Sequence, residues 1–155
     1  MVEYLYVEEI IEINKLCLEL SNENEEFILL QPDDLEFVLN FSSENFADIY
    51  DISLAYCISL IVLHLFKNGN HRTSLIAAEH FLLKNNYQYI GSEESDLKIQ
   101  KWRIHFENKN DLEREFFRIT CIEDLKKKSE EIKNIMRSKY GKTIEKWLKE
   151  NFNES

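Results

Sequence analysis

The chain has 155 residues, with 29 acidic and 19 basic side chains and a net charge of −10. A chain of this length suits a single domain that buries its own core without disulfides or metals. The excess of acidic residues argues against nucleic acid as a partner, because phosphate binding needs a basic surface. The most apolar run, residues 52–66, is interrupted by polar side chains and falls short of the ~20 residues that span a bilayer, so we expect no membrane contact.

The charge is unevenly distributed along the chain. Residues 1–60 contain fourteen acidic side chains and one basic one, Lys15, whereas residues 121–155 contain nine basic and seven acidic ones. Two interpretations of the acidic half stay open. It forms a solvated outer face that keeps the chain in solution, or it forms a surface for a basic partner.

The cysteines and the opening residues indicate the compartment. Cys17, Cys57 and Cys121 are widely spaced and odd in number, and no CxxC pair occurs. This pattern argues against a disulfide framework and favours reduced thiols in the cytosol. The opening stretch MVEYLYVEEI lacks the basic segment of a secretory signal. We therefore expect a cytoplasmic protein.

Apolar side chains spaced three or four residues apart, with only 3 Gly and 1 Pro, predict an all-α fold. The pattern predicts a first helix over Val7–Leu20. A second helix begins at Pro32, because proline suits the first turn and the acidic residues after it suit the positive end. The third, over about Ala47–Leu65, is apolar on nearly every side and therefore belongs in the centre of the fold.

The second half of the chain continues in the same way. A fourth helix begins near Arg72 and stops at Asn85, and residues 87–95 are either a short extended piece or a turn. A fifth helix is expected near Leu97–Phe106, and another over residues 112–120. Residues 122–148 predict one or two amphipathic helices, with an interruption at Gly141. Packing into the core and binding of a partner helix both stay open for this stripe.

The segment HLFKNGNHRTS, residues 64–74, separates the third helix from the fourth. Gly69 allows the backbone to approach a ligand closely. The N–H groups at the start of the next helix lack intrahelical partners and, with the helix dipole, favour an anion. Arg72 adds a forked cation and Asn70 an amide donor. The loop therefore predicts a phosphate-binding site.

His64 lies just before this loop. Partial desolvation favours its neutral form, which is the form that a general base needs. A neutral imidazole beside bound phosphates suggests proton removal from a hydroxyl that attacks phosphorus. Loops of this composition also cap helices routinely, and single histidines are often structural, so a purely structural role stays open at this point.

The loop residues resemble the signature of the Fic/Doc family, His-x-Phe-x-(Asp/Glu)-Gly-Asn-x-Arg. Five of its six defined positions match, and HRTSL at residues 71–75 is similar to the Doc extension of the motif. The opening YLYVEEIIEINK and the later FLLKNNYQY are also similar to the Doc branch. The resemblance covers about residues 4–120, so we expect a Fic/Doc-like domain at 1–120 and a helical extension at 121–155.

The resemblance implies an all-α Fic fold and transfer of AMP or, as in Doc, phosphate. The donor would be ATP or a related nucleotide, and the acceptor a Ser, Thr or Tyr hydroxyl of a protein target. By position, His64 would be the general base and Phe66 would anchor the loop in the core. The residues that would bind the nucleotide phosphates are Asn68, Gly69, Asn70, His71 and Arg72.

Three positions depart from the family pattern. Asn68 replaces the acid that binds Mg²⁺; an amide oxygen can coordinate but carries no charge, so we expect weakened Mg²⁺ binding. Leu75 stands where AMP-transferring members have a second arginine, which favours the Doc branch. His71 replaces the lysine of Doc and would donate to a phosphate when protonated. A non-catalytic Fic-fold module that binds a nucleotide or a protein is the rival interpretation.

Regulation and target alignment give two further expectations. The nearest match to the family's inhibitory motif, SNENEE at residues 21–26, ends differently and falls in a predicted loop. We therefore expect a toxin-like protein restrained by a separate small antitoxin. The segment that aligns the target is expected within residues 40–49.

Two other groups of residues are candidate sites, a cysteine–histidine pair and a possible metal-binding set, and neither is favoured. Cys57 and His64 share a face of one helix and point alike, so they are better read as core residues than as a nucleophile and its base. The residues His64, His71, Glu79 and His80 lack a metal-ligand spacing.

Overall fold

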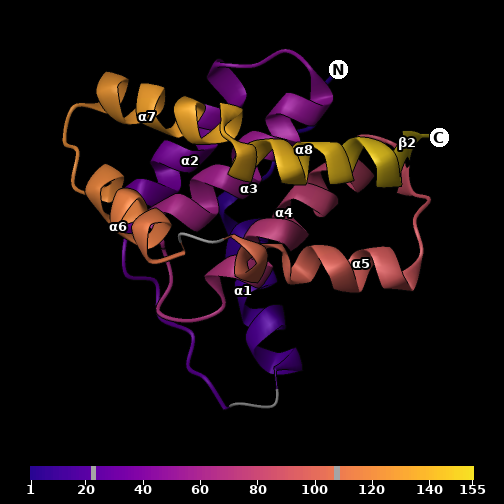
Figure 1. Ribbon diagram of the computed structural model, residues 1–155, viewed down its shortest axis with the longest axis horizontal. Coiled ribbons are helices and arrows are strands. Elements are labelled where there is room, and N and C mark those ends of the chain that lie inside the picture. Colours follow the sequence, from indigo (N-terminus) through magenta and orange to yellow (C-terminus); the bar gives the residue numbers. More distant parts are fainter. Residues whose placement is uncertain (22–23, 107–108) are drawn as a thin grey trace.

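A computed structural model describes residues 1–21, 24–106 and 109–155. The described part is mainly helical, as predicted, and Figure 1 shows its helices gathered around one that is central. The α-helices in this part are α1 Val7–Leu20, α2 Pro32–Glu44, α3 Ile49–Leu63, α4 Asn70–Lys84, α5 Glu93–Gln100, α6 Lys109–Thr120, α7 Leu125–Arg137 and α8 Lys139–Asn151. The shorter elements are the 3-10 helix η1 Trp102–His105 and the strands β1 Tyr87–Tyr89 and β2 Phe152–Glu154.

Helix α3 is the centre of the molecule. Every residue from Ile52 to Leu63 is buried, which explains why this segment is apolar on all sides. Its start is fixed by Asp48, whose carboxylate accepts hydrogen bonds from the N–H groups of Tyr50 and Asp51. Helices α2, α4, α6, α7 and α8 all pack against α3, and α1 packs against α4 (Figure 1).

The predicted boundaries agree best in the first half. Helix α1 has the predicted limits, and α2 begins at Pro32 as predicted. The predicted fifth helix was wrong in its limits, because an α-helix ends at Gln100 and a separate 3-10 turn follows. Gly141 does not interrupt the tail. The break falls at Ser138, whose hydroxyl caps α8, and Gly141 lies in the first turn, where a side chain would collide with the backbone of α7.

Residues 121–155, expected to be a helical extension, form two helices and a strand that share the core of the rest. Ile132, Ile144 and Leu148 are each fully buried in the same cluster as α3. Lys128 forms a buried ion pair with Asp34 of α2 (Nζ–Oδ1 3.2 Å). The tail therefore packs as part of the domain rather than beside it.

Strands β1 and β2 pair antiparallel and bring the end of the chain back to α4. Tyr89 lies opposite Phe152, and the Tyr50 hydroxyl donates to the Phe152 carbonyl (2.8 Å). The sequence predicted an extended piece at 87–95 as one of two alternatives, but did not predict its partner strand.

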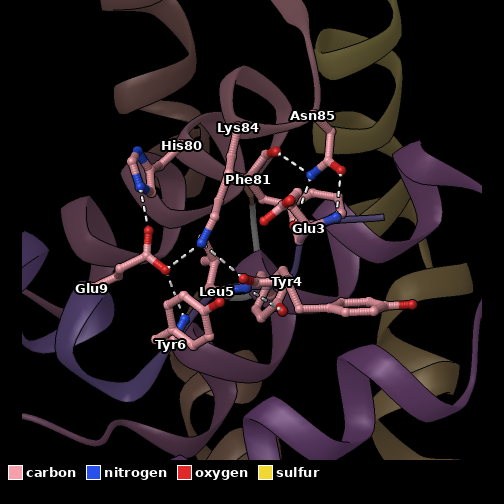
Figure 2. A network of polar contacts seen from close by, with 10 residues as sticks. Glu3, Tyr4, Leu5, Tyr6, Glu9, His80, Phe81, Lys84 and Asn85 are labelled. Atoms are coloured by element: carbon pink, nitrogen blue, oxygen red, sulfur yellow. Dashed lines mark hydrogen bonds and ion pairs between the residues drawn. The ribbon is translucent and has the colours of Figure 1, made fainter. Parts of the chain in front are cut away.

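A polar network ties the N-terminal segment and α1 to the C-terminal end of α4 (Figure 2). Glu9 pairs with Lys84 (2.7 Å) and with His80 (2.8 Å), and its carboxylate accepts a hydrogen bond from the Tyr6 N–H. Asn85 exchanges two hydrogen bonds of 2.8 Å with the backbone of Glu3. These contacts place α1 against α4, and so beside the loop at the other end of α4.

None of the helices in the described residues has both the length and the hydropathy needed to cross a membrane.

Candidate active site

His64 ends α3 in the left-handed conformation, with φ 51° and ψ 58°. Residues other than glycine seldom adopt this conformation, and it is held here by the packing on both sides. The turn at His64 sends Leu65 and Phe66 into the core, where each is at most 1% exposed, and leaves the imidazole exposed. Helix α3 therefore ends two residues earlier than the sequence predicted, and the candidate base is the capping residue rather than a helical one.

Phe66, the expected anchor of the loop, packs its ring against Phe27 with centroids 5.9 Å apart. The backbone on either side pairs with an extended segment before α2. The Lys67 N–H donates to the Ile28 carbonyl (2.9 Å), and the Leu30 N–H donates to the Leu65 carbonyl (2.7 Å). The first residues of the loop are therefore held both by side-chain packing and by backbone pairing.

The extended segment that pairs with the loop is residues 28–30. That residues 40–49 align the target stays a prediction. Residues 40–44 belong to α2, and Phe41 and Ser42 are buried there. The proline and the acidic side chains of the first turn made the start of this helix easy to recognise. Of the nearest match to an inhibitory motif, residues 22–23 lie outside the described part, and residues 24–26 are not helical.

The side chain of Asn70 closes the loop from within. Its Oδ1 accepts a hydrogen bond from the Phe66 N–H (2.9 Å), and its Nδ2 donates to the Phe66 carbonyl (2.6 Å). Asn70 is 6% exposed. Both ends of the amide are therefore engaged by the backbone of Phe66, within the loop.

Asn14, on α1, was not singled out from the sequence. Its side chain is fully buried, and its Nδ2 donates to the Asn68 carbonyl (2.9 Å) and to Thr73 Oγ1 (3.0 Å). It therefore joins the loop to the first turn of α4. The signal that pointed to it is a single amide within the apolar face of α1.

Gly69 is required where the loop passes Asn14. It has φ +75°, and a Cβ there would lie 3.2 Å from both Asn14 Nδ2 and Leu18 Cδ2. A larger residue would therefore meet both a backbone penalty and a close contact with α1.

Helix α4 begins at Asn70, two residues before the predicted start. Among the described residues, none accepts a hydrogen bond from the N–H groups of Asn70, His71 or Arg72, and the first turn contains no acidic side chain. Arg72 is exposed, and no ion pair joins it to another described residue. Open N–H groups, the positive end of a helix and an unpaired guanidinium together form a site suited to an anion.

The imidazole of His64 is held in its neutral form. Partial burial lowers its pKa below the usual 6.5, the positive charge of Arg103 lowers the pKa further, and Glu113 opposes the shift. Arg103 in turn pairs with Glu113 (3.5 Å). At neutral pH His64 therefore carries a free lone pair and can accept a proton.

The surroundings of the His71 ring disfavour its protonated form, the form in which it would donate to a phosphate. Burial, with a further contribution from Arg103, lowers the pKa of His71 to about 4. Its ring stacks on Trp102 with centroids 4.5 Å apart. At neutral pH His71 is uncharged, and its backbone N–H is one of the open donors in the first turn of α4.

Comparison with known proteins agrees with the loop geometry. A model of the Fic/DOC family matches residues 4–82, which is just over half of the chain. The chain belongs to the Fic/DOC family. No curated protein and no solved structure matches it.

The Fic/DOC match contains α1, α2, α3, nearly all of α4, the whole loop and Asn14. It is a match to the family as a whole, so the likeness to the Doc branch stays a prediction. Trp102 and Arg103, which lie next to the loop in space, fall outside the matched residues.

The residues of the loop do not fit a Mg²⁺ ion held by the protein. Asn68 offers one amide oxygen, while its Nδ2 donates to the Glu26 carbonyl (3.3 Å). Among the described residues, no three His, Cys, Asp or Glu side chains lie close enough together to hold a metal. Mg²⁺ is usually bound through carboxylates and substrate phosphates.

Cys57 has no role as a nucleophile. Its thiol is fully buried 3.9 Å from Ser74 Oγ, and burial raises its pKa to about 12. His64, by contrast, is exposed at the end of α3. His80 is also separate from the loop, since it pairs with Glu9 near the other end of α4.

Proposed function

We propose that this Fic/DOC chain transfers AMP or phosphate from ATP, or a related nucleotide, to a hydroxyl of a protein target. The observation that carries the proposal is the neutral, exposed imidazole of His64 beside the open first turn of α4 with its unpaired Arg72. A base and an anion site at the two ends of one short loop are what attack of a hydroxyl on phosphorus requires.

The proposed reaction moves one proton and exchanges one bond. His64 takes the proton of the target hydroxyl as the oxygen attacks phosphorus. For AMP transfer the new bond forms to the α-phosphorus, and the bond to diphosphate breaks. For phosphate transfer it forms to the γ-phosphorus, and the bond to ADP breaks. The N–H groups of Asn70, His71 and Arg72, with the Arg72 guanidinium, stabilise the charge on the phosphate oxygens.

Asn68 favours a second candidate, a Fic-fold module that binds a nucleotide or a protein without turnover. Its uncharged side chain stands where a metal-binding acid would otherwise lie. Asn68→Asp distinguishes the two functions. If the substitution raises Mg²⁺-dependent transfer above a measurable wild-type level, the chain is a weak enzyme. If neither form transfers anything, the binding module is favoured.

The first prediction tests His64. Purified protein is incubated with cell lysate and ATP labelled at either the α- or the γ-phosphorus, and labelled proteins are identified by mass spectrometry. We expect label in a protein target with the wild type, and a loss of at least about 100-fold with His64→Ala, in line with the usual contribution of a general base. The position of the transferred label separates AMP from phosphate transfer.

His80→Ala is the matched control, because it removes another partly exposed histidine on the side of α4 away from the loop. It should leave transfer unchanged. Labelling retained by a folded His64→Ala variant contradicts the assignment of the base.

We also propose that a separate small antitoxin restrains the protein. The described residues 24–31 before α2 are not helical, so they supply no inhibitory helix over the loop. Affinity purification of the complex from native cells tests this. Recovery of the chain alone, at a concentration that allows growth, would contradict it.

A further inference from the structure

The ring of His71 is fixed by stacking rather than by hydrogen bonds. It lies at 24° to the ring of Trp102, which is 3% exposed. The Nε2 atom of His71 is buried, and no described residue forms a hydrogen bond with it. Trp102 is therefore the contact that determines where this imidazole points.

Trp102 is in turn fixed by Tyr140, on α8. The two rings have centroids 5.2 Å apart, and neither Trp102 Nε1 nor the Tyr140 hydroxyl has a hydrogen-bond partner in the described part of the chain. Tyr140 is 2% exposed and is enclosed by Phe106 (5.1 Å) and Phe116 (5.5 Å). A continuous row of aromatic rings in contact therefore runs from the first turn of α4 to α8.

The first residue of this row of rings, His71, also contributes a backbone N–H to the proposed anion site. The His71 N–H is one of the three open donors in the first turn of α4, and the His71 carbonyl accepts a hydrogen bond from Ser74 Oγ (2.7 Å). A side chain held in one rotamer restricts the backbone that carries it. Movement of the ring would therefore disturb the N–H that faces the phosphate.

We infer that Tyr140 is a positioning residue for the anion site, and that it acts through Trp102 on His71. The inference deepens the proposed function and, where it concerns phosphate binding, rests on it. By this inference, Trp102 and Tyr140, which lie outside the Fic/DOC match, help to position the loop. Residues 121–155 therefore position the loop through Tyr140, in addition to covering the core.

The test compares three variants. Tyr140→Met keeps most of the volume but removes the ring. Tyr140→Phe keeps the ring and removes a hydroxyl that has no partner. Trp147→Met is the matched control, because Trp147 is a buried aromatic on the same helix that packs against Tyr89 and Phe152 instead. Circular dichroism and thermal melting report whether each variant folds.

The first readout is the titration of the His71 imidazole, followed by NMR. It does not depend on any nucleotide. The wild type should hold the His71 pKa near its lowered value of about 4. Tyr140→Met should move it towards the ordinary 6.5, while Tyr140→Phe and Trp147→Met leave it in place. An equal change in Tyr140→Met and Trp147→Met, or none in Tyr140→Met, overturns the inference.

The second readout is the dissociation constant of inorganic tripolyphosphate, measured by calorimetry. We expect Tyr140→Met to weaken binding by about tenfold, roughly the effect of losing one hydrogen bond to a charged group. Tyr140→Phe should bind tripolyphosphate as tightly as the wild type. Unchanged binding in Tyr140→Met, when the wild type binds, contradicts the inference.

If the wild type binds no tripolyphosphate, the proposed function fails while the His71 titration still decides the role of Tyr140. If Tyr140→Met does not fold, Trp102→Phe interrupts the same row. It should move the His71 titration in the same direction, and an unmoved titration would again overturn the inference.

Discussion

At the scale of single residues, the side chain of Asn70 holds the loop in its observed conformation. Its amide supplies both hydrogen bonds that the buried backbone of Phe66 needs, across a span of four residues. Unpaired buried backbone groups cost free energy. The loop therefore needs a side chain that has both a donor and an acceptor at a fixed separation, as an amide does.

We predict that Asn70→Ala destabilises the protein by about 2–4 kcal/mol, because it leaves the N–H and the carbonyl of Phe66 unpaired. For a chain of this length the loss corresponds to a fall in Tm of roughly 5–15 °C. Thermal and urea unfolding measure it. Asn68→Ala is the control, since the Asn68 side chain forms a single exposed hydrogen bond, and a similar loss in both variants would contradict the explanation.

Local residue types were enough to predict that the loop suits an anion. They were not enough to predict which residues hold the loop in three dimensions. Gly69 and Arg72 follow each other within a few residues, so a motif can specify their arrangement. The contacts of Asn14 with Asn68, and of His71 with Trp102, join residues 54 and about thirty positions apart. Such pairs depend on how helices pack, and no local periodicity contains that information.

At the scale of elements, the position of α1 on α4 depends on Glu9 (Figure 2). Burial alone would raise the pKa of Glu9, but hydrogen bonds from Lys84, the Tyr6 backbone and His80 outweigh it and lower the pKa below the usual 4.5. A lowered pKa in the folded state means that the carboxylate stabilises the fold above pH 4.5. That stabilisation is lost as the pH falls through the folded value.

We predict that Glu9→Gln lowers the Tm at pH 7 and that the difference from the wild type shrinks as the pH falls below 4.5. Melting curves between pH 3 and pH 8 measure the effect. Glu12→Gln is the control, because Glu12 forms an exposed pair with Lys15 (3.6 Å), and such pairs contribute little. A difference for Glu9→Gln that is constant with pH would contradict the electrostatic explanation.

Element limits were predictable where one residue decides them, and less so elsewhere. Pro32 and Asp33 mark the start of α2 by chemistry that acts locally. The end of α3 and the start of α4 depend instead on the left-handed turn at His64 and on the closure by Asn70. In the tail, Ser138 rather than Gly141 makes the break, because a capping hydroxyl stops one helix and starts the next.

At the scale of the whole molecule, the last residues complete the core. Phe152 is 1% exposed and packs against Tyr89 (5.4 Å) and Trp147 (6.0 Å). A partner strand for residues 87–89 could not be read from the sequence, since the two strands are each three residues long and more than sixty residues apart. The all-α class was nevertheless predictable, because helical periodicity dominates the chain.

We predict that Phe152→Ala costs about 3–5 kcal/mol of stability, as expected for a fully buried phenylalanine. The neighbouring Asn153→Ala, on the exposed face of the same strand, should change stability by less than about 0.5 kcal/mol. Urea unfolding of both variants tests the prediction. Equal effects would mean that the strand is stabilised by its backbone pairing rather than by the packing of its first side chain.

The backbone groups of Glu3 and Ser155 both form hydrogen bonds with the pair Asn85–Asn86. Helix α4 has 15 residues, so this meeting point lies about 22 Å along the helix from Gly69. A short linker could therefore close the polypeptide into a ring, and a circularly permuted form could be opened elsewhere on the surface. Reporter groups attached at residues 3 and 155 would therefore lie close together, remote from the loop at the other end of α4.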